Sequence, residues 1–299
     1  LYLPDVASYL SSNVSYYDFG FSAAAFLVLI GFAFKAAVVP FHFWSPDVYE
    51  GAPTSVTAYM ASVVKVAVAG ASLRFIYVLL NAHFFSSQLN VVLWCGAVLS
   101  MVLGNFLGLR QNSIKRMLAY SSVAHVGYMI LGLLALKTGG ASALLYYVIV
   151  YGVMTLGAFG VVHCVEYLRG RGDTLSAFEG LGKTQPFLAG IMALFMFALA
   201  GLPPGLSGLL GKFYLFNAAI QGSYVWVVVI AVLSTVVSCF YYLRVVVFMY
   251  FKNWAEGEGE NKPEAGEAPF FALCLLFLCG LFTVLAGVFP SILHNAALF

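Results

Sequence analysis

Long apolar runs with almost no charge constrain this chain more than any other feature. The run over residues 54–73, for example, contains a single charged side chain, Lys65. Only 9% of the 299 residues are charged, whereas a soluble domain carries roughly 25%. So few charges cannot cover a water-facing surface, which excludes a soluble enzyme, a disordered chain and a nucleic-acid-binding protein. The apolar runs do not alternate with period two, which disfavours an outer-membrane barrel.

The number of spans follows from the apolar content. A membrane helix needs about 20 apolar residues, so 62% of the chain suffices for about eight helices with short loops. We therefore predict an all-α polytopic membrane protein. The predicted spans cover residues 19–44, 54–80, 89–109, 113–136, 141–168, 187–220, 224–251 and 269–290. The first span is interrupted at Pro40, and the sixth, which is too long for one crossing, is broken at Pro203 and Pro204.

Charge alternates between the loops, and this predicts the orientation of the chain. The loops after the third, fifth and seventh spans hold Arg110, Lys115, Arg116, Arg169, Arg171, Lys183, Lys252 and Lys262. The positive-inside rule places these loops in the cytoplasm. Residues 1–299 then form one transmembrane domain, with cytoplasmic loops at 169–186 and 252–268. The second of these loops carries five glutamates and is expected to be solvated.

Three lysines are expected at membrane depth: Lys35, Lys65 and Lys212. A charge at the bilayer centre costs at least about 2.5–3.5 kcal/mol. Lys65 lies about ten residues, or roughly 15 Å, from the nearer interface, so its side chain cannot easily reach water. No Asp or Glu lies clearly at the same depth. Either the amines exchange protons near neutral pH because burial disfavours their charge, or a partner acid lies elsewhere; both possibilities describe a proton path.

Two of these lysines accompany the predicted helix breaks. Lys35 precedes Pro40 by five residues, and Lys212 follows Pro204 by eight. Broken helices are tolerated in a bilayer where they line protein or a water-filled cavity, and their half-helix ends suit ions in transporters. The two broken spans are expected to run in opposite directions, as in an inverted repeat.

Two histidines are further candidates. His125 lies within the fourth span among small and hydroxylic residues, and is either a packing residue or a relay between lysines, because imidazole titrates near neutral pH. His42 lies after the first break and is either an interfacial anchor or a relay. No catalytic, metal-binding or cofactor-binding pattern appears, and the five cysteines lie in apolar runs as expected of small buried residues.

Seven short stretches carry a resemblance to a known family. The longest is KAAVVPFHFWSPDVYEGAPT at residues 35–54. The others are SVVK at 62–65, NSIKRMLAYSS at 112–122, HVGY at 125–128, GLPPG at 201–205, GKFY at 211–214 and YYLR at 241–244. In these stretches, over nearly its whole length, the chain resembles the antiporter-like membrane subunits of respiratory complex I, and among them the subunit N family of NADH-quinone oxidoreductase.

The resemblance implies the fold and the roles of the site residues. It implies an antiporter-like fold of fourteen helices. This chain would correspond to the last eight of these helices and would lack the first six. Lys35, Lys65 and Lys212 then correspond to proton-channel lysines, with His125 and His42 as accessory relay candidates. An acidic residue on the family's fifth helix would pair with the first of these lysines.

The function implied is that of a proton-translocating subunit of an NADH (or other donor):quinone oxidoreductase in the bacterial cytoplasmic (inner) membrane. The expected partners are the lipid bilayer and other membrane subunits of complex I, including neighbouring antiporter-like subunits, but no nucleic acid. Quinone, FMN and iron–sulfur clusters are expected in partner subunits rather than in this chain. Two alternatives stay open: a subunit of a related cation/proton antiporter, and a membrane scaffold that moves no protons.

Overall fold

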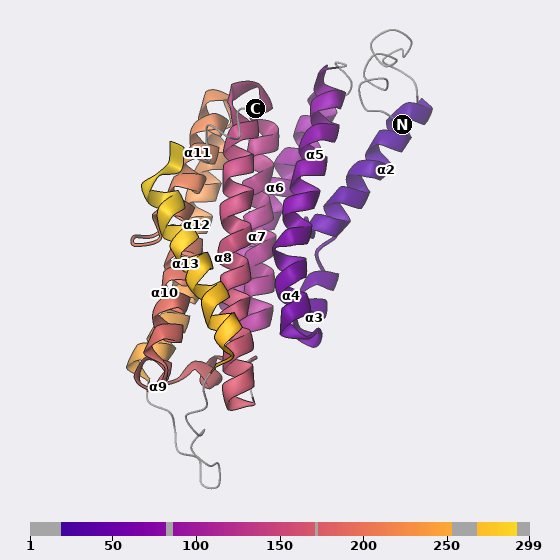
Figure 1. The fold of residues 1–299 in the computed structure, drawn as a ribbon. Coiled ribbons are helices and arrows are strands. Elements are labelled where there is room, and N and C mark those ends of the chain that lie inside the picture. Colours follow the sequence, from indigo (N-terminus) through magenta and orange to yellow (C-terminus); the bar gives the residue numbers. More distant parts are fainter. Residues whose placement is uncertain (1–18, 82–85, 171–172, 253–267, 292–299) are drawn as a thin grey trace.

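The computed structural model describes residues 19–81, 86–170, 173–252 and 268–291, and its regular elements in these ranges are helices (Figure 1). The α-helices are α2 (Phe19–Ala36), α3 (Trp44–Gly51), α4 (Thr54–Ala61), α5 (Val63–Asn81), α6 (Ser86–Leu109), α7 (Ile114–Leu134), α8 (Gly140–Arg169), α9 (Leu181–Thr184), α10 (Pro186–Ala200), α11 (Leu206–Gln221), α12 (Val225–Phe251) and α13 (Phe270–Val288). Two 3₁₀ turns, η1 (Leu136–Thr138) and η2 (Leu175–Phe178), lie in the connections.

The predicted all-α, multi-span fold is confirmed. Within the described residues, six helical segments are long and apolar enough to cross a membrane, and two shorter apolar helices accompany them at Ala23–Ala36 and Pro186–Ala200. Each predicted span coincides with helix, and most boundaries agree within a few residues. The acidic loop expected at 252–268 falls almost entirely outside the described residues. The assignment of loops to one side of the membrane stays a prediction.

Helix α7 lies at the centre of the bundle. It packs against α6, α8, α11 and α3, and nearly all of its residues are buried. In Figure 1, α2 and α5 lie to one side of α6, α7 and α8, and α10 to α13 lie to the other. Polar side chains on α7 are therefore enclosed by protein and do not face lipid.

Two glycines allow α6 and α7 to approach closely, as small residues do at helix interfaces in membranes. A Cβ at Gly104 on α6 would lie 2.7 Å from the backbone nitrogen of Ala124 on α7. Likewise, a Cβ at Gly127 on α7 would lie 2.8 Å from the carbonyl oxygen of Ala97 on α6. Both distances are too short for real atoms, so larger residues require the helices to separate.

We expect Gly127→Val to reduce the amount of folded protein in membranes, because overpacking a tight contact costs about 1–3 kcal/mol. Gly70→Val is the matched control, since Gly70 also lies within a helix but a Cβ there meets nothing within 4 Å. The two variants share the helix-propensity cost of the substitution. Equal thermal stability of the two variants in detergent would contradict this account of the α6–α7 contact.

Both predicted helix breaks are confirmed. Helix α2 ends at Ala36, ahead of Pro40, and the freed backbone N–H of Val39 donates to Ser100 Oγ at 3.0 Å. Helix α10 ends at Ala200, where Gly201 adopts a left-handed φ of 81°, and α11 begins after the two prolines. Proline accounts for both breaks because it lacks a backbone donor and disfavours helix in the residue before it.

A third interruption, which the sequence analysis did not predict, lies inside the span predicted at 54–80, and the segment Thr54–Leu79 remains one candidate membrane span. The structure divides this span at Ser62 into α4 and α5. The Ser62 hydroxyl donates to the carbonyl oxygen of Ala58 at 2.5 Å, a contact that competes with regular helix geometry. No proline or glycine marks this position, so the span appeared uninterrupted in the sequence.

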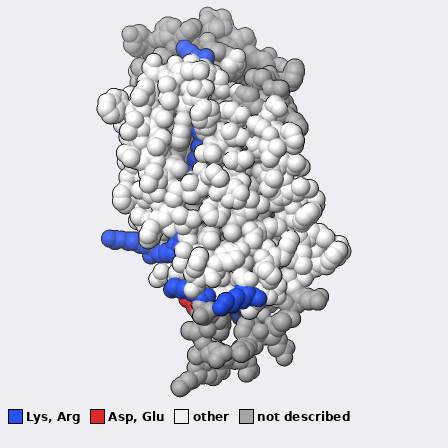
Figure 2. Space-filling model, turned by 90° about the vertical axis from the view of Figure 1, so that its left-hand side faces the viewer, with Lys and Arg blue, Asp and Glu red and all other residues white. Residues whose placement is uncertain are grey.

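Most of the basic residues between spans gather at one end of the bundle, where α6 and α8 end and α7 begins, whereas Lys137 lies at the other end. Figure 2 shows Lys and Arg side chains gathered toward one end of the visible face, with uncharged side chains covering most of the rest. Backbone hydrogen bonds join the α6–α7 connection to the segment after α8 at this end. The N–H of Ile114 donates to Asp173 O at 2.6 Å, and the N–H of Leu175 donates to Asn112 O at 2.9 Å. This end has the charge expected of a cytoplasmic face.

Candidate functional site

A row of polar side chains on α7 forms the centre of the candidate site. Ser121 and Ser122 lie four and three residues before His125, and Tyr128 lies three residues after it, which places these side chains on turns of the helix that adjoin the turn of His125. All four are buried. Such a row inside an apolar bundle requires hydrogen-bond partners from the surrounding helices.

Lys65 reaches the row from α5. Its side chain is 3% exposed, and its Nζ donates to the hydroxyl of Ser122 and, at 3.3 Å, to the carbonyl oxygen of the same residue. The expected deep burial of Lys65 is confirmed. The described residues supply no carboxylate to this ammonium group, and both of its hydrogen bonds among them are with Ser122.

Lys212 approaches the opposite part of the row from α11. It is also 3% exposed, and its Nζ donates to the carbonyl oxygens of Leu199 and Ala200, each at 2.9 Å. These are carbonyls at the C-terminus of α10, freed by the helix break, where a positive charge is favoured. The same nitrogen lies 5.1 Å from the centroid of the Tyr128 ring. Gly201 leaves room for it, because a Cβ there would lie 3.4 Å from this nitrogen.

Along α7, His125 lies between Ser122, which contacts Lys65, and Tyr128, whose ring lies near the Lys212 ammonium group. Its Nδ1 is 2.6 Å from the hydroxyl of Tyr147 on α8, and its Nε2 is 2.9 Å from the hydroxyl of Tyr242 on α12. Tyr151 on α8 packs against the ring, with 4.9 Å between centroids. The structure therefore brings Lys65, His125 and Lys212 together around α7. The tyrosine partners come from residues 22 and 117 positions away, and the sequence analysis missed them.

Lys35 is placed differently from the other lysines. It lies in the last turn of α2 and is exposed, and no hydrogen bond or ion pair joins it to another described residue. The reason is that α2 lies at the edge of the bundle and packs mainly against α5. The expectation that Lys35 is enclosed at membrane depth is therefore not met within this chain, and its pairing with an acid from outside the chain stays a prediction.

Several buried polar atoms in and beside the segment after the first break make no hydrogen bond of normal geometry. Among the described residues these are His42 Nδ1, Ser45 Oγ and Tyr49 Oη, with Thr155 Oγ1 on the neighbouring α8. The Tyr49 hydroxyl faces the hydroxyls of Ser45 and Ser122. His42 is buried, with its ring 4.4 Å from that of Phe43, so it is enclosed rather than an exposed interfacial anchor. Buried polar groups of this kind commonly bind internal water.

Ion pairs tie this segment to α7 and α8 at the charged end. Arg116 Nη1 lies 2.7 Å from Asp47 Oδ1 and 2.8 Å from Glu50 Oε2, which joins α3 to α7. Lys115 Nζ lies 2.7 Å from Glu166 Oε1, and Glu166 Oε2 accepts a hydrogen bond from the Thr54 hydroxyl at 2.5 Å. The sequence placed these acids near an interface but gave no sign of their partners, which are 51 to 112 positions away.

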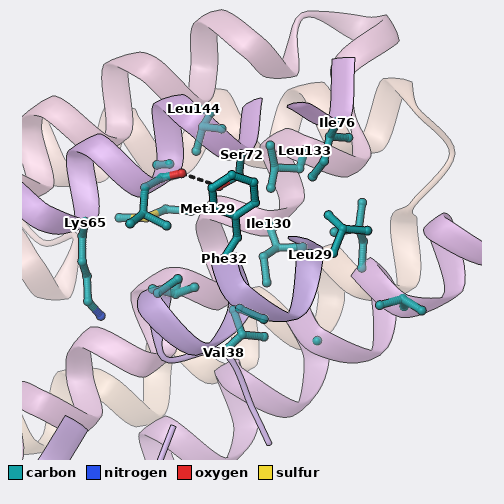
Figure 3. Close-up of a pocket in the computed structure, with 18 of the residues that line it drawn as sticks. Leu29, Phe32, Val38, Lys65, Ser72, Ile76, Met129, Ile130, Leu133 and Leu144 are labelled. Atoms are coloured by element: carbon teal, nitrogen blue, oxygen red, sulfur yellow. Dashed lines mark hydrogen bonds between the residues drawn. The ribbon is translucent and has the colours of Figure 1, made fainter. Parts of the chain in front are cut away.

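An apolar cavity of about 110 Å³ lies beside Lys65, between α2, α5, α6 and α7. Figure 3 shows Lys65 at one side of it, with the labelled apolar side chains, such as Phe32, Ile76 and Leu133, grouped apart from its nitrogen. The Ser72 hydroxyl bonds to its own helix at Val68 O. A cavity with such walls stays dry, so polar contact to Lys65 comes from the α7 side.

A polar pocket of about 360 Å³ lies at the other end of the bundle, where α7 and α11 end. Its polar lining includes Asn90, Lys137, Thr138, Gln221 and Ser223. Gln221 lies nine residues beyond Lys212 on the same helix, or about 14 Å along its axis. This end is opposite the one that carries the ion pairs.

Comparison with known proteins identifies the family. The family model described as "NADH:quinone oxidoreductase/Mrp antiporter, TM" matches residues 1–238. The chain belongs to this family. The resemblance carried by the seven sequence stretches is thereby confirmed, and the family has the antiporter-like fold that the sequence predicted.

Relatives within the family bear the name expected from the sequence. NADH-quinone oxidoreductase subunit N of Trichlorobacter lovleyi is 44% identical over 272 residues, which are 91% of this chain and 54% of that protein. Subunit N of Nitrosomonas europaea is 38% identical over 301 residues, which cover 100% of this chain and 60% of that protein. The chain thus spans about half the length of the relatives it matches. With six helical segments long and apolar enough to cross a membrane among its described residues, the chain is a multi-pass protein of the bacterial inner membrane.

Solved structures agree with this placement. The chain superimposes on one from respiratory complex I of Thermus thermophilus with bound Aureothin, with a TM-score of 0.80, 33% identity and coverage of 98% of this chain and 64% of that one. It also superimposes on a chain of the Mrp complex from Dietzia sp., with a TM-score of 0.83, 19% identity and coverage of 99% and 64%. The second likeness concerns the fold alone.

Proposed function

We propose that this chain carries protons across the membrane as part of a subunit of a quinone oxidoreductase. The observation that carries the proposal is the buried arrangement of Lys65, His125 and Lys212 around α7. Two ammonium groups enclosed in an apolar bundle cost free energy of insertion. Such residues are retained where they mark an ion or proton pathway. The relatives are named as subunit N of NADH-quinone oxidoreductase, which supports the assignment to a quinone oxidoreductase.

The proposed route runs across the middle of the membrane. Lys65 and Lys212 hold protons at its two ends, and His125 passes them between the lysines. Lys35 pairs with a carboxylate supplied from outside this chain and passes protons into the route from the side of α2. His42 and the neighbouring unpaired polar atoms lie between the charged end and Lys65, where they support proton uptake through water. The polar pocket near Gln221 is the opening on the opposite face.

The helix breaks have a role in this proposal. Pro40, Pro203 and Pro204 follow helices that end part-way across the predicted spans, and so free backbone groups at membrane depth. The carbonyls freed at the end of α10 accept hydrogen bonds from the Lys212 ammonium group. They stabilise the protonated form of this lysine without adding a permanent negative charge, so the site can both gain and lose a proton.

The energy source lies outside this chain in our proposal. NADH or another donor reduces quinone in partner subunits that hold FMN and iron–sulfur clusters, and this chain has no redox centre of its own. Neighbouring antiporter-like subunits and other complex I membrane subunits are its partners. The cation/proton antiporter alternative rests on the Mrp likeness, which at 19% identity supports the shared fold and not a shared cargo.

The function is tested with His125→Gln in the full subunit, within the complex purified from its host and reconstituted in liposomes. A positioned proton-transfer group typically contributes 10²–10⁴-fold to a rate. We therefore expect the protons that this subunit moves per electron to fall by roughly that factor. Glutamine retains hydrogen bonding but cannot titrate. An unchanged ratio of protons to electrons at normal quinone reduction would contradict the relay.

A further inference from the structure

Tyr128 has no role in the route proposed above, although its ring lies against the Lys212 ammonium group. It lies on α7, three residues after His125, and is 1% exposed. The Nζ of Lys212 lies over the face of this ring, 5.1 Å from its centroid. An aromatic ring attracts a cation that lies over its face within about 6 Å of the centroid, and the attraction is stronger where water is excluded. Both side chains are buried, so this contact is of the stronger kind.

The attraction depends on the protonation state of Lys212. The ring acts on the positive charge, so it stabilises the ammonium form and does little for the neutral amine. The carbonyl oxygens of Leu199 and Ala200 contact the same nitrogen from α10, each at 2.9 Å. The ammonium group is therefore held by carbonyls of α10 and by a ring of α7. A shift of the ring would weaken the hold on the proton at this site.

Contacts from two further helices hold the ring of Tyr128 in place. Its hydroxyl lies 3.5 Å from Asn105 Nδ2 on α6 and 3.3 Å from Thr235 Oγ1 on α12. The edge of the ring meets the imidazole of His125, with 5.7 Å between centroids and an angle of 84° between planes. Because these neighbours are packed on different sides, the ring cannot turn away from the ammonium group without displacing them.

The amide of Asn105 is itself held firmly. It is 1% exposed and lies inside the membrane span Gln88–Leu109, where a buried amide needs hydrogen-bond partners. Its Oδ1 accepts from the hydroxyl of Tyr241 at 2.9 Å, and its Nδ2 donates to Met101 O at 2.8 Å. An amide nitrogen has two protons to donate. The second of them is left for the hydroxyl of Tyr128.

We infer that the Tyr128 ring holds the Lys212 ammonium group in place, and that Asn105 and Thr235 are positioning residues that hold this ring. The inference rests on the proposed function. No proton passes through Tyr128 in this role, because the face of the ring supplies the attraction and the hydroxyl only anchors the ring. An aliphatic side chain at position 128 would fill much of the same space without attracting the ammonium group.

The first test changes the electrostatics of the ring and leaves its size nearly constant. Phenylalanine with no, one, two or three ring fluorines is placed at position 128 of the full subunit, in the complex reconstituted in liposomes. Fluorine withdraws electron density from the face of the ring and so weakens its attraction for a cation. We expect the protons that this subunit moves per electron to fall with each fluorine, and Tyr128→Leu to lower them roughly 5- to 30-fold. Lys212→Met defines the level at which this subunit moves none.

The control for the first test is the same series of phenylalanines at Phe195. This residue is a fully buried ring of α10 that packs against α8 at Gly157. Fluorine at Phe195 enlarges a buried ring to the same degree, but this ring packs against helix α8 and not against the ammonium group. The protons moved per electron should stay constant along this series.

The second test compares two threonines with matched surroundings. The hydroxyls of Thr235 and Thr283 each donate to the carbonyl oxygen four residues earlier, at 3.0 Å and 2.8 Å, and the hydroxyl of Thr235 also reaches Tyr128. We expect Thr235→Val and Asn105→Leu to lower the protons moved per electron roughly twofold to fivefold, and Thr283→Val to leave them unchanged. In the Tyr128→Leu background, Thr235→Val and Asn105→Leu should cause no further loss.

Three outcomes would overturn the inference. The first is a constant ratio along the fluorine series at position 128 while Lys212→Met stops translocation, which would leave the proposed function intact. The second is a loss from Asn105→Leu or Thr235→Val that is absent, or is as large in the Tyr128→Leu background as outside it. The third is normal translocation in Lys212→Met, which removes the role of this lysine and the inference with it. If Tyr128→Leu prevents assembly, the fluorine series alone decides.

Discussion

Lys65→Met is expected to remove proton translocation through this subunit while leaving the protein as stable as before, or more stable. Methionine has a similar length and flexibility, and it introduces no charge. Replacing a buried charge with an apolar group of similar volume is often neutral or stabilising, because the desolvation penalty is removed. Among the described residues, the Lys65 ammonium group donates hydrogen bonds to Ser122 alone, so little hydrogen bonding is lost. The expected fall in protons moved is roughly 10²-fold or more.

The measurement is the ratio of protons to electrons in liposomes, together with the thermal unfolding temperature of the purified complex. Lys183→Met is the matched control, since Lys183 is an exposed lysine of α9 at the charged end. It should change neither quantity. A Lys65→Met complex that moves protons normally would refute the role of this lysine. A complex that fails because it unfolds would instead indicate that Lys65 is a structural residue.

Lys212→Met is expected to remove proton translocation to a similar extent but to lower stability, and this contrast separates the two lysines. The Lys212 ammonium group caps two carbonyls at the end of α10, at Leu199 and Ala200. Leaving a buried acceptor unsatisfied costs about 1–3 kcal/mol. That loss is offset in part by removal of the buried charge, so a lower unfolding temperature is expected in Lys212→Met than in Lys65→Met. Equal unfolding temperatures of the two variants would contradict the capping role.

Lys212→Arg refines the same prediction. Arginine can donate to both carbonyls, so it should restore stability. It does not give up its proton at physiological pH, so it should not restore proton translocation. Recovery of proton translocation by arginine would mean that the residue supplies only a fixed positive charge.

The features that the sequence predicted correctly are those encoded locally. Apolar runs of membrane length indicated the helices, and Pro40, Pro203 and Pro204 indicated two of their breaks. Lys65 was recognised as buried because its distance to either interface depends only on its position along one span. The same local reasoning failed for Lys35, since exposure there depends on where α2 packs, at the edge of the bundle. The break at Ser62 was missed because one serine is a weak signal beside proline.

The contacts that complete the site could not be predicted. Tyr147 and Tyr242 become partners of His125 only when α8 and α12 pack against α7, and neither residue differs in the sequence from the other tyrosines nearby. The ion pairs of Arg116 with Asp47 and Glu50 likewise join residues 69 and 66 positions apart. Tertiary packing alone decides such pairs.

The most direct test of the account is a high-resolution electron-cryomicroscopy map of the intact complex, in which ordered water can be seen. The account predicts water molecules or polar side chains in hydrogen-bond contact between Lys65 and His125 and between His125 and Lys212. Both lysine nitrogens would then be joined in one polar connection around α7. Nitrogens in dry contact with aliphatic side chains, with no water or polar group linking them, would contradict the claim that these lysines pass protons across the membrane.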